Sequence, residues 1–197
     1  MQRLRVLVGC EYSGTVRDAF AAKGHDAWSC DLLPSETEGQ HIQGDVLEVL
    51  GEGWDLMIGH PPCTHLAVSG ARWFKEKLQQ QTEALEFVLK LMNAPIRHIA
   101  IENPVSIISS RIRPPDQIIQ PYQFGHGEMK TTCLWLKNLP KLKPTMIVSG
   151  REQRLWKLPP SEDRWMLRSK TYQGIADAMA AQWSELEYYQ TELKLIS

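Results

Sequence analysis

Two short motifs, Pro61-Pro62-Cys63 and Glu102-Asn103-Pro104, contain the residue types best suited to chemistry. Two prolines fix the backbone before the cysteine, so its thiol should project rigidly instead of packing inside as a small hydrophobic group. A thiolate can add to C6 of a pyrimidine ring if a carboxyl group holds or protonates N3. Such an addition would make C5 of the ring nucleophilic toward a methyl donor.

The cysteine taken alone has a simpler interpretation, because most isolated cysteines are buried and unreactive. His60 and His65 flank Cys63, which would also suit a Cys-His hydrolase, but the sequence shows neither a third orienting group nor an oxyanion feature. The four cysteines are widely spaced, without a Cys-x-x-Cys motif. We therefore expect reduced thiols, no disulfide framework and no metal site.

The elements that must position these motifs alternate between strand-like and helix-like patterns. Strands are predicted over residues 4–8, 26–30, 54–58, 96–101 and 131–136, and helices over 16–23, 80–92 and 172–195. Residues 111–124 are predicted to be a surface loop, and residues 137–170 to wrap the surface. The alternation predicts an α/β fold with a mostly parallel sheet, helices on both faces and a ligand crevice at the carboxyl ends of the strands. Both motifs follow strands and should meet there.

A turn rich in small and polar residues follows the first predicted strand, and its candidate contacts are Gly9, Glu11, Tyr12, Ser13 and Gly14. Simple turn chemistry would explain the glycines. Alternatively, they let the backbone approach a nucleoside cofactor whose ribose hydroxyls bond to Asp31, about twenty residues further on. The spacing does not choose between a dinucleotide and S-adenosylmethionine. Asp45 is either a second cofactor contact or an exposed turn acid.

In their order along the chain, the glycine turn, Asp31, Gly44-Asp45 and the two motifs resemble the cytosine-C5 DNA methyltransferases. The resemblance spans about the first half of the chain. It implies a Rossmann-like S-adenosylmethionine-dependent methyltransferase fold, with the first three elements and Pro61 at the cofactor. It also implies that Cys63 attacks C6, that Glu102 contacts N3, and that Pro62 and Asn103 lie at the substrate. Residues 169–176 resemble a later family element that closes over the cofactor, which adds Gly174.

Two departures from the family concern the substrate. Members carry Gln-x-Arg-x-Arg before a late strand, whereas this chain has Glu128-Met-Lys130-Thr-Thr132, with Lys130 as the surviving cation. The target-recognition domain that follows in the family has no room here, because about thirty residues separate Leu136 from Arg168. Sequence-specific reading of the major groove is therefore not expected of this chain alone. Low specificity, a homodimer or a helper subunit would each be compatible with that loss.

A basic segment over residues 137–157 carries six cations and one acid, a local charge of +5 in a chain of net charge -1. Lys141, Lys143, Arg151 and Arg154 could contact phosphates, and Trp156 could stack on an unpaired base. A solvated loop anchored by Trp156 is an equal alternative. If the first interpretation holds, this segment partly replaces the lost recognition domain.

The bulk composition sets the remaining expectations. A chain of 197 residues with 43% apolar residues can bury one core, so we expect a single domain over residues 1–197. No apolar run approaches the roughly 18 residues of a membrane span, and the start lacks a signal-peptide core. The protein should be cytoplasmic, in the host if phage-encoded.

The leading hypothesis is methylation of C5 of cytosine in DNA, with the base extruded from the helix. Methylation of RNA or of a free cytosine nucleotide is the first alternative. A catalytically silent cofactor- or nucleic-acid-binding protein is the second.

Overall fold

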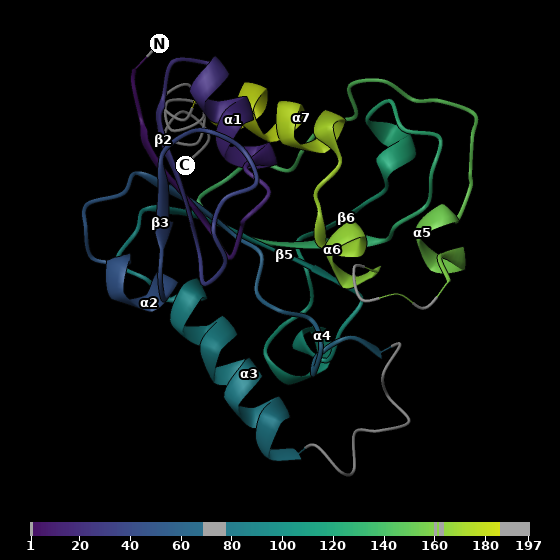
Figure 1. The fold of residues 1–197 in the computed structure, drawn as a ribbon, viewed down its shortest axis with the longest axis horizontal. Helices are drawn as coiled ribbons and strands as arrows, with labels where there is room; N and C mark the ends of the chain where they lie inside the picture. The colour runs from purple at the N-terminus through teal and green to yellow at the C-terminus, as the bar shows by residue number, and fades with distance from the viewer. Residues whose placement is uncertain (1, 69–77, 160, 162–163, 186–197) are drawn as a thin grey trace, which may run out of the picture.

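The computed structural model describes residues 2–68, 78–159, 161 and 164–185. Its elements, shown in Figure 1, are β1 (Arg5–Gly9), α1 (Thr15–Ala22), β2 (Asp26–Asp31), β3 (His41–Gln43), α2 (Val46–Val49), β4 (Leu56–Gly59), α3 (Leu78–Met92), β5 (His98–Pro104), α4 (Ile108–Arg111), β6 (Gln117–Ile119), the 3-10 turn η2 (Pro121–Gln123), β7 (Thr132–Lys137), α5 (Arg154–Lys157), α6 (Arg164–Ser169) and α7 (Gln173–Trp183).

A seven-stranded sheet in the order β3-β2-β1-β4-β5-β7-β6 forms the centre of the molecule. The first five strands in that order are parallel to their neighbours. β7 runs antiparallel to β5, and β6 runs antiparallel to β7. This topology confirms the predicted fold class, a Rossmann-like α/β fold with a mostly parallel sheet.

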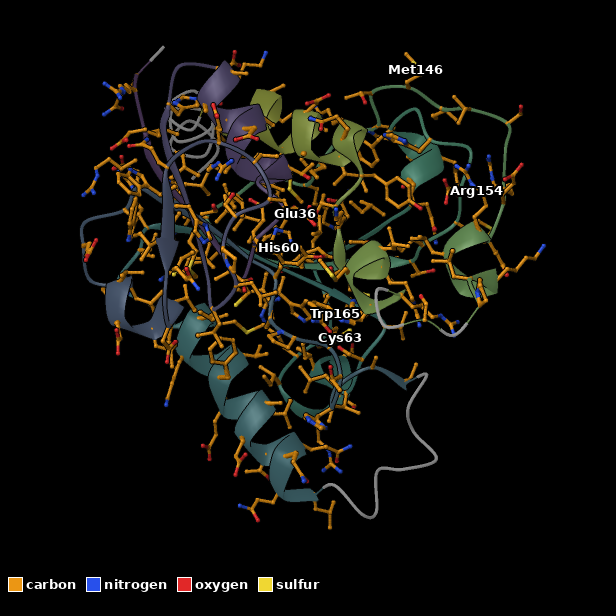
Figure 2. All side chains as sticks on the ribbon, in the orientation of Figure 1. Glu36, His60, Cys63, Met146, Arg154 and Trp165 are labelled. Carbon is orange, nitrogen blue, oxygen red and sulfur yellow. The ribbon has the colours of Figure 1, made fainter. Side chains whose placement is uncertain are left out.

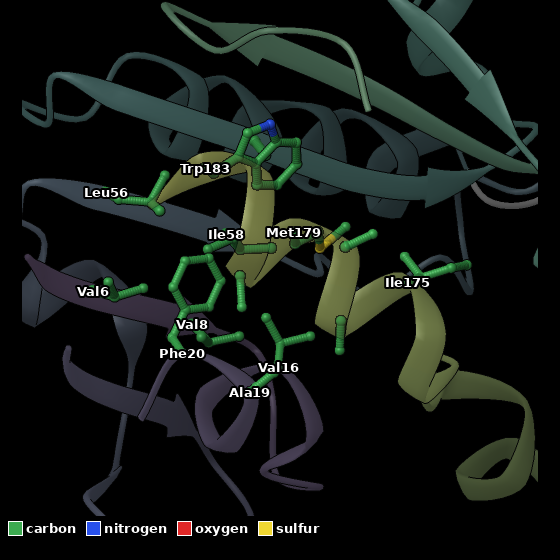
Figure 3. Packing of buried hydrophobic residues seen from close by; sticks show 14 of the residues in the cluster. Val6, Val8, Val16, Ala19, Phe20, Leu56, Ile58, Ile175, Met179 and Trp183 are labelled. Carbon is green, nitrogen blue, oxygen red and sulfur yellow. The ribbon is translucent and has the colours of Figure 1, made fainter. Parts of the chain in front are cut away.

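Helices cover both faces of the sheet because successive strand side chains point to opposite sides. Val6 and Val8 of β1 belong to a buried cluster with residues of α1 and α7, while Leu7 belongs to a second cluster with Val88 and Leu91 of α3. Figure 3 shows the first cluster, where Phe20 packs between the strands and α7. The two cores hold the strand ends in place.

All five predicted strands exist within a few residues of their expected positions, as do the first two predicted helices. β3 and β6 were not predicted, and β6 makes the loop prediction for residues 111–124 wrong in part. Each has three residues, too few to show a period, and β6 exists because Gln117–Ile119 pairs with β7. The predicted last helix begins as α7, and residues 186–195 of that prediction lie outside the described part.

None of the described helices is both long enough and apolar enough to span a membrane.

Candidate active site

The register of β4 and β5 brings the two motifs together. Gly59 lies opposite Ile101 in this parallel pair, so His60 and Glu102 follow side by side at the carboxyl edge of the sheet. The backbone N–H of His60 donates to the carbonyl of Gly9 at 2.9 Å, which also ties the loop after β4 to β1. The predicted meeting of the Cys63 loop with the end of β5 is confirmed.

Asn103 holds the cysteine loop from inside the protein. Its side chain is buried, and its Nδ2 donates to the carbonyl of Pro61 at 2.8 Å. Pro62 and Cys63 are exposed at the top of that loop. A buried amide aimed at the loop backbone makes Asn103 a positioning residue for Cys63, although the family resemblance had placed it at the substrate.

Cys63 lies at the surface, yet surrounding protein atoms shield its sulfur enough to change its acidity. Burial raises the pKa of the Cys63 thiol, and the carboxylate of Glu102 raises it further. The positive charges of Lys130 and Arg168 act in the opposite direction without overcoming these effects. The resting group is therefore a thiol at neutral pH, and forming the nucleophile requires a nearby acceptor for its proton.

Glu102 pairs with His60, a role that the sequence did not suggest. His60 Nδ1 lies 3.0 Å from Glu102 Oε2, and both side chains are about nine-tenths buried. Burial alone would raise the pKa of Glu102, but the hydrogen bond from His60 and the charges of His60 and Lys130 lower it. Glu102 is thus a carboxylate that a buried imidazole holds in one orientation. The position of His60, one residue beyond β4, was the available signal.

The other ring nitrogen of His60 is an exception to normal hydrogen bonding. Among the described residues, His60 Nε2 is buried and has no partner. An unsatisfied buried polar atom costs about 1–3 kcal/mol, so we expect an ordered water or a bound molecule to complete the hydrogen bonding of Nε2. Burial raises the pKa of Glu11, which lies two residues beyond β1, and the charge of His60 partly opposes that rise. His60 therefore contacts Glu102 through its side chain and the start of the glycine turn through its backbone.

Lys130, the candidate substrate contact of the divergent motif, lies beside Glu102. The two residues line one small pocket together with Thr171 and Tyr172. Lys130 Nζ donates to the carbonyl of Lys170 at 3.1 Å, which fixes the ammonium group near this pocket. Lys130 therefore lies close enough for its positive charge to lower the pKa values of both Glu102 and Cys63.

The glycine turn has structural explanations for much of its sequence. Gly14 has a φ of +73°, and a Cβ atom there would come within 2.2 Å of Thr37 Oγ1. A Cβ atom on Gly9 would lie 2.9 Å from Val46 Cγ2. The carboxylate of Glu11 accepts the backbone N–H groups of Val16 and Arg17 at 2.7 and 3.1 Å, so it caps α1. These contacts favour the turn-chemistry explanation for Gly14 and Glu11.

Tyr12 and Ser13 are buried in the same turn. The Tyr12 hydroxyl donates to the carbonyl of Met166 at 3.1 Å and lies 3.0 Å from Ser169 Oγ. Tyr12 therefore links the turn to α6. The hydroxyl of Ser13 is 3.4 Å from Glu11 Oε1 and supports the capping carboxylate.

The two acidic candidates differ in their surroundings. Asp31, at the carboxyl end of β2, is half-buried, and its Oδ1 accepts the N–H of Leu33 at 2.9 Å. Asp45 is exposed and caps α2 through the N–H of Leu47. A carboxylate at the end of β2, one strand away from the glycine turn, fits the ribose hydroxyls of a nucleoside cofactor. Asp45 matches the simpler alternative of an exposed turn acid.

Gly174 also has a packing role. A Cβ atom there would come within 1.9 Å of the Phe124 carbonyl oxygen, and the Gly174 N–H donates to His126 Nε2 at 3.0 Å. The start of α7 thus lies against residues 124–126, which requires glycine whether or not a cofactor is near.

The basic segment does not form one surface. Lys143 donates its backbone N–H to Gln182 at the end of α7, and Trp183 donates to the Pro140 carbonyl at 3.0 Å. These contacts follow the end of β7, where Lys137 pairs with Ile99 near the start of β5. Lys141 and Lys143 therefore lie at the amino edge of the parallel strands, opposite Cys63.

The arginines of this segment are engaged within the protein. The Arg151 guanidinium lies 3.5 Å from the Tyr122 ring centroid and donates to two carbonyl oxygens. Arg154 pairs with Glu128 and Glu152 and lies well away from Cys63 in Figure 2. The side chain of Trp156 lies outside the described part of the structure. The phosphate-binding prediction for this segment remains a prediction, without a shared surface to support it.

No protein-family model and no curated protein matches this sequence. A solved structure that resembles it is described as a presumed DNA modification methyltransferase encoded within a prophage of E. coli. The identity is 17% and the TM-score is 0.49, over 79% of this chain and 55% of the other. The chain thus spans just over half the length of that protein. At this similarity the match carries no weight for function, and the fold assignment rests on the strand order.

Proposed function

We propose that this chain is an S-adenosylmethionine-dependent methyltransferase that acts on C5 of cytosine in DNA. One observation carries the proposal: Cys63 is exposed at the carboxyl edge of the sheet, beside a Glu102 carboxylate that His60 holds in place. A thiol and an oriented carboxylate at this edge are the two groups that covalent activation of a pyrimidine needs.

The resting charges of the two groups suit the first step. Cys63 holds a proton because its pKa is raised, and Glu102 lacks one because its pKa is lowered. Glu102 can therefore take the thiol proton as sulfur bonds to C6, and pass that proton to N3 as the ring electrons shift toward it. The net change is addition of S–H across C6 and N3. Lys130 and Arg168 stabilise the developing thiolate.

The later steps reverse this proton movement. The addition leaves C5 electron-rich, and S-adenosylmethionine would supply an electrophilic methyl group to it. Loss of the C5 proton to solvent then restores the C5–C6 double bond as sulfur leaves, and the N3 proton returns to the thiolate. His60 keeps Glu102 in position throughout, because its hydrogen bond uses Oε2 and leaves the other oxygen for the substrate.

The cofactor would lie at the carboxyl ends of β1 and β2. Asp31 would hold the ribose hydroxyls, and the backbone at Gly9 would allow close approach. Pro61 connects this region to the cysteine loop. Calorimetry with S-adenosylmethionine and its homocysteine product should detect binding, and an Asp31→Ala variant should weaken it. Equal or tighter binding of NAD would contradict the cofactor assignment.

The acceptor and the nucleophile can be tested together. The protein is incubated with labelled S-adenosylmethionine and with duplex DNA, single-stranded DNA, RNA or free cytosine nucleotides, and label transfer is measured. A 5-fluorocytosine acceptor should trap a covalent adduct, because fluorine at C5 cannot leave as a proton does. Mass spectrometry should place the adduct on a peptide containing Cys63, with unmodified cytosine as the control. An adduct on Cys10, Cys30 or Cys133 would refute the mechanism.

A further inference from the structure

The helix α6 is held against the candidate active site by residues distant in sequence. Tyr12 of the glycine turn donates to the Met166 carbonyl and contacts Ser169. Just beyond the helix, Lys170 forms an ion pair with Glu36 at 2.6 Å, and its carbonyl accepts Lys130 Nζ. These contacts attach both the helix and the residue after it to the edge that carries Glu102 and Cys63.

Trp165 is presented on this helix instead of being buried. It is 54% exposed, and none of the residues of α6 is buried. The centroid of its ring lies 6.0 Å from that of Tyr12, with the two planes tilted by 55°, so the indole has one aromatic neighbour while about half of the residue remains exposed. Figure 2 shows Trp165 next to Cys63 in this view. A large aromatic side chain, exposed on the helix whose Arg168 charge acts on Cys63, is a candidate contact for a flat ligand.

A cation lies on the same face of the helix. Trp165 and Arg168 are three residues apart, so their side chains are neighbours on the helix surface. Arg168 is exposed, and its charge is close enough to Cys63 to oppose the rise in the pKa of that thiol. The α6 face, defined as Trp165 and Arg168, therefore offers an aromatic surface and a positive charge at the mouth of the site.

We propose that the α6 face binds an unpaired nucleotide strand, with a base stacked on Trp165 and a backbone phosphate at Arg168. The inference rests on the proposed function and names the form of substrate that the site accepts. Stacking on an aromatic ring tolerates any base, and a phosphate contact is independent of sequence. Both suit the expectation that this chain does not read the major groove by sequence. The α6 face thus takes the role that the sequence had suggested for Trp156 and the basic segment.

Binding is tested without cofactor, by fluorescence anisotropy of a labelled single-stranded oligodeoxynucleotide of mixed sequence containing cytosine. Trp165→Ala should weaken binding by roughly tenfold, the scale of losing one base stack. Trp165→Phe should restore most of the affinity. Leu167→Ala is the matched control, because Leu167 is also exposed on α6, at 49%, but is not aromatic. Circular dichroism checks that each variant is folded.

The phosphate contact has a separate readout. Arg168→Gln should reduce the slope of log affinity against log salt by about one ion, whereas Trp165→Ala should leave that slope unchanged. Equal affinities for Trp165→Ala, Leu167→Ala and the parent protein would overturn the inference, as would binding to duplex DNA alone.

The two proposals can fail separately because binding needs neither cofactor nor turnover. A tenfold loss in Trp165→Ala, with no methyl transfer to any acceptor, would retain the α6 face and reject the methyltransferase function. Methyl transfer by the parent protein, with unaltered binding in Trp165→Ala, would retain the methyltransferase function and reject the α6 face.

Discussion

The Cys63–Glu102 region and the segment over residues 137–170 both carry candidate functional residues, but they are organised differently. In the first, Cys63 lies in the loop that follows β4 and Glu102 lies near the end of β5, and the β4–β5 register brings that loop and that strand end together. In the second, the chain leaves β7 at the amino edge, passes Lys141 and Lys143, and returns through Arg154 to α6 at the carboxyl edge. Residues close in the sequence of this segment thus end at opposite edges of the sheet.

The comparison shows where the sequence alone can predict that residues lie together in a site. A strand end is a reliable location because the ladder of hydrogen bonds fixes which residues lie side by side. A segment without periodicity is placed by long-range contacts, such as Trp183 with the Pro140 carbonyl and Tyr12 with the Met166 carbonyl. A cluster of charges in such a segment does not predict a charged surface.

The largest effect is expected in the Cys63–Glu102 region. Cys63→Ser should reduce methyl transfer by at least about 10³-fold, because a hydroxyl is a far weaker nucleophile than a thiolate. The rate in the parent protein should increase as pH rises above neutrality, since the raised pKa of Cys63 keeps the thiolate scarce at pH 7. Measured label transfer in Cys63→Ser at the parental rate would remove this residue from the mechanism.

A second test separates position from charge at His60. His60→Leu removes the hydrogen bond that lowers the pKa of Glu102, so burial should raise that pKa and the acidic limb of the rate–pH profile should move to higher pH. We expect a loss of turnover of about 10²-fold, the lower end of general acid–base effects. His60→Asn keeps an N–H donor near the position of Nδ1 and should recover part of the rate. Identical profiles for both variants and the parent would show that the pair has no role.

A smaller effect is measurable without substrate. Glu102→Gln removes a negative charge that raises the pKa of Cys63, so the pKa should fall and iodoacetamide should alkylate Cys63 several-fold faster at neutral pH. Methyl transfer should slow in the same variant. Glu86→Gln, on the exposed side of α3, is the matched control. Slower alkylation in Glu102→Gln would contradict the proposed electrostatic coupling.

The smallest effect is expected in the basic segment. Replacing Lys141 and Lys143 together with glutamine should change affinity for single-stranded DNA by less than about twofold and leave the salt slope intact, because these lysines lie at the edge of the sheet opposite Cys63. Arg168→Gln, which removes half as much charge, should have the larger effect on the slope. Fluorescence anisotropy at several salt concentrations measures these slopes. If the slope falls as much in the double lysine variant as in Arg168→Gln, the basic segment is a binding surface after all.

Local patterns were enough to predict the α/β fold, the positions of five strands and the proximity of Cys63 to Glu102. Aliphatic runs with a period of two or 3.6 encode strands and helices, and parallel strands carry their following residues to one edge. The same reasoning placed Asp31 at the end of β2, where it is found.

Long-range packing determined the rest. The short strands β3 and β6 exist because a neighbouring strand pairs with them, and Gly174 is explained by its close approach to Phe124. The hydrogen bond between His60 and Glu102 joins residues 42 positions apart, and the contacts of Tyr12 with α6 span more than 150. Such contacts leave no periodic trace in the sequence, because they depend on which surfaces the two hydrophobic cores bring together.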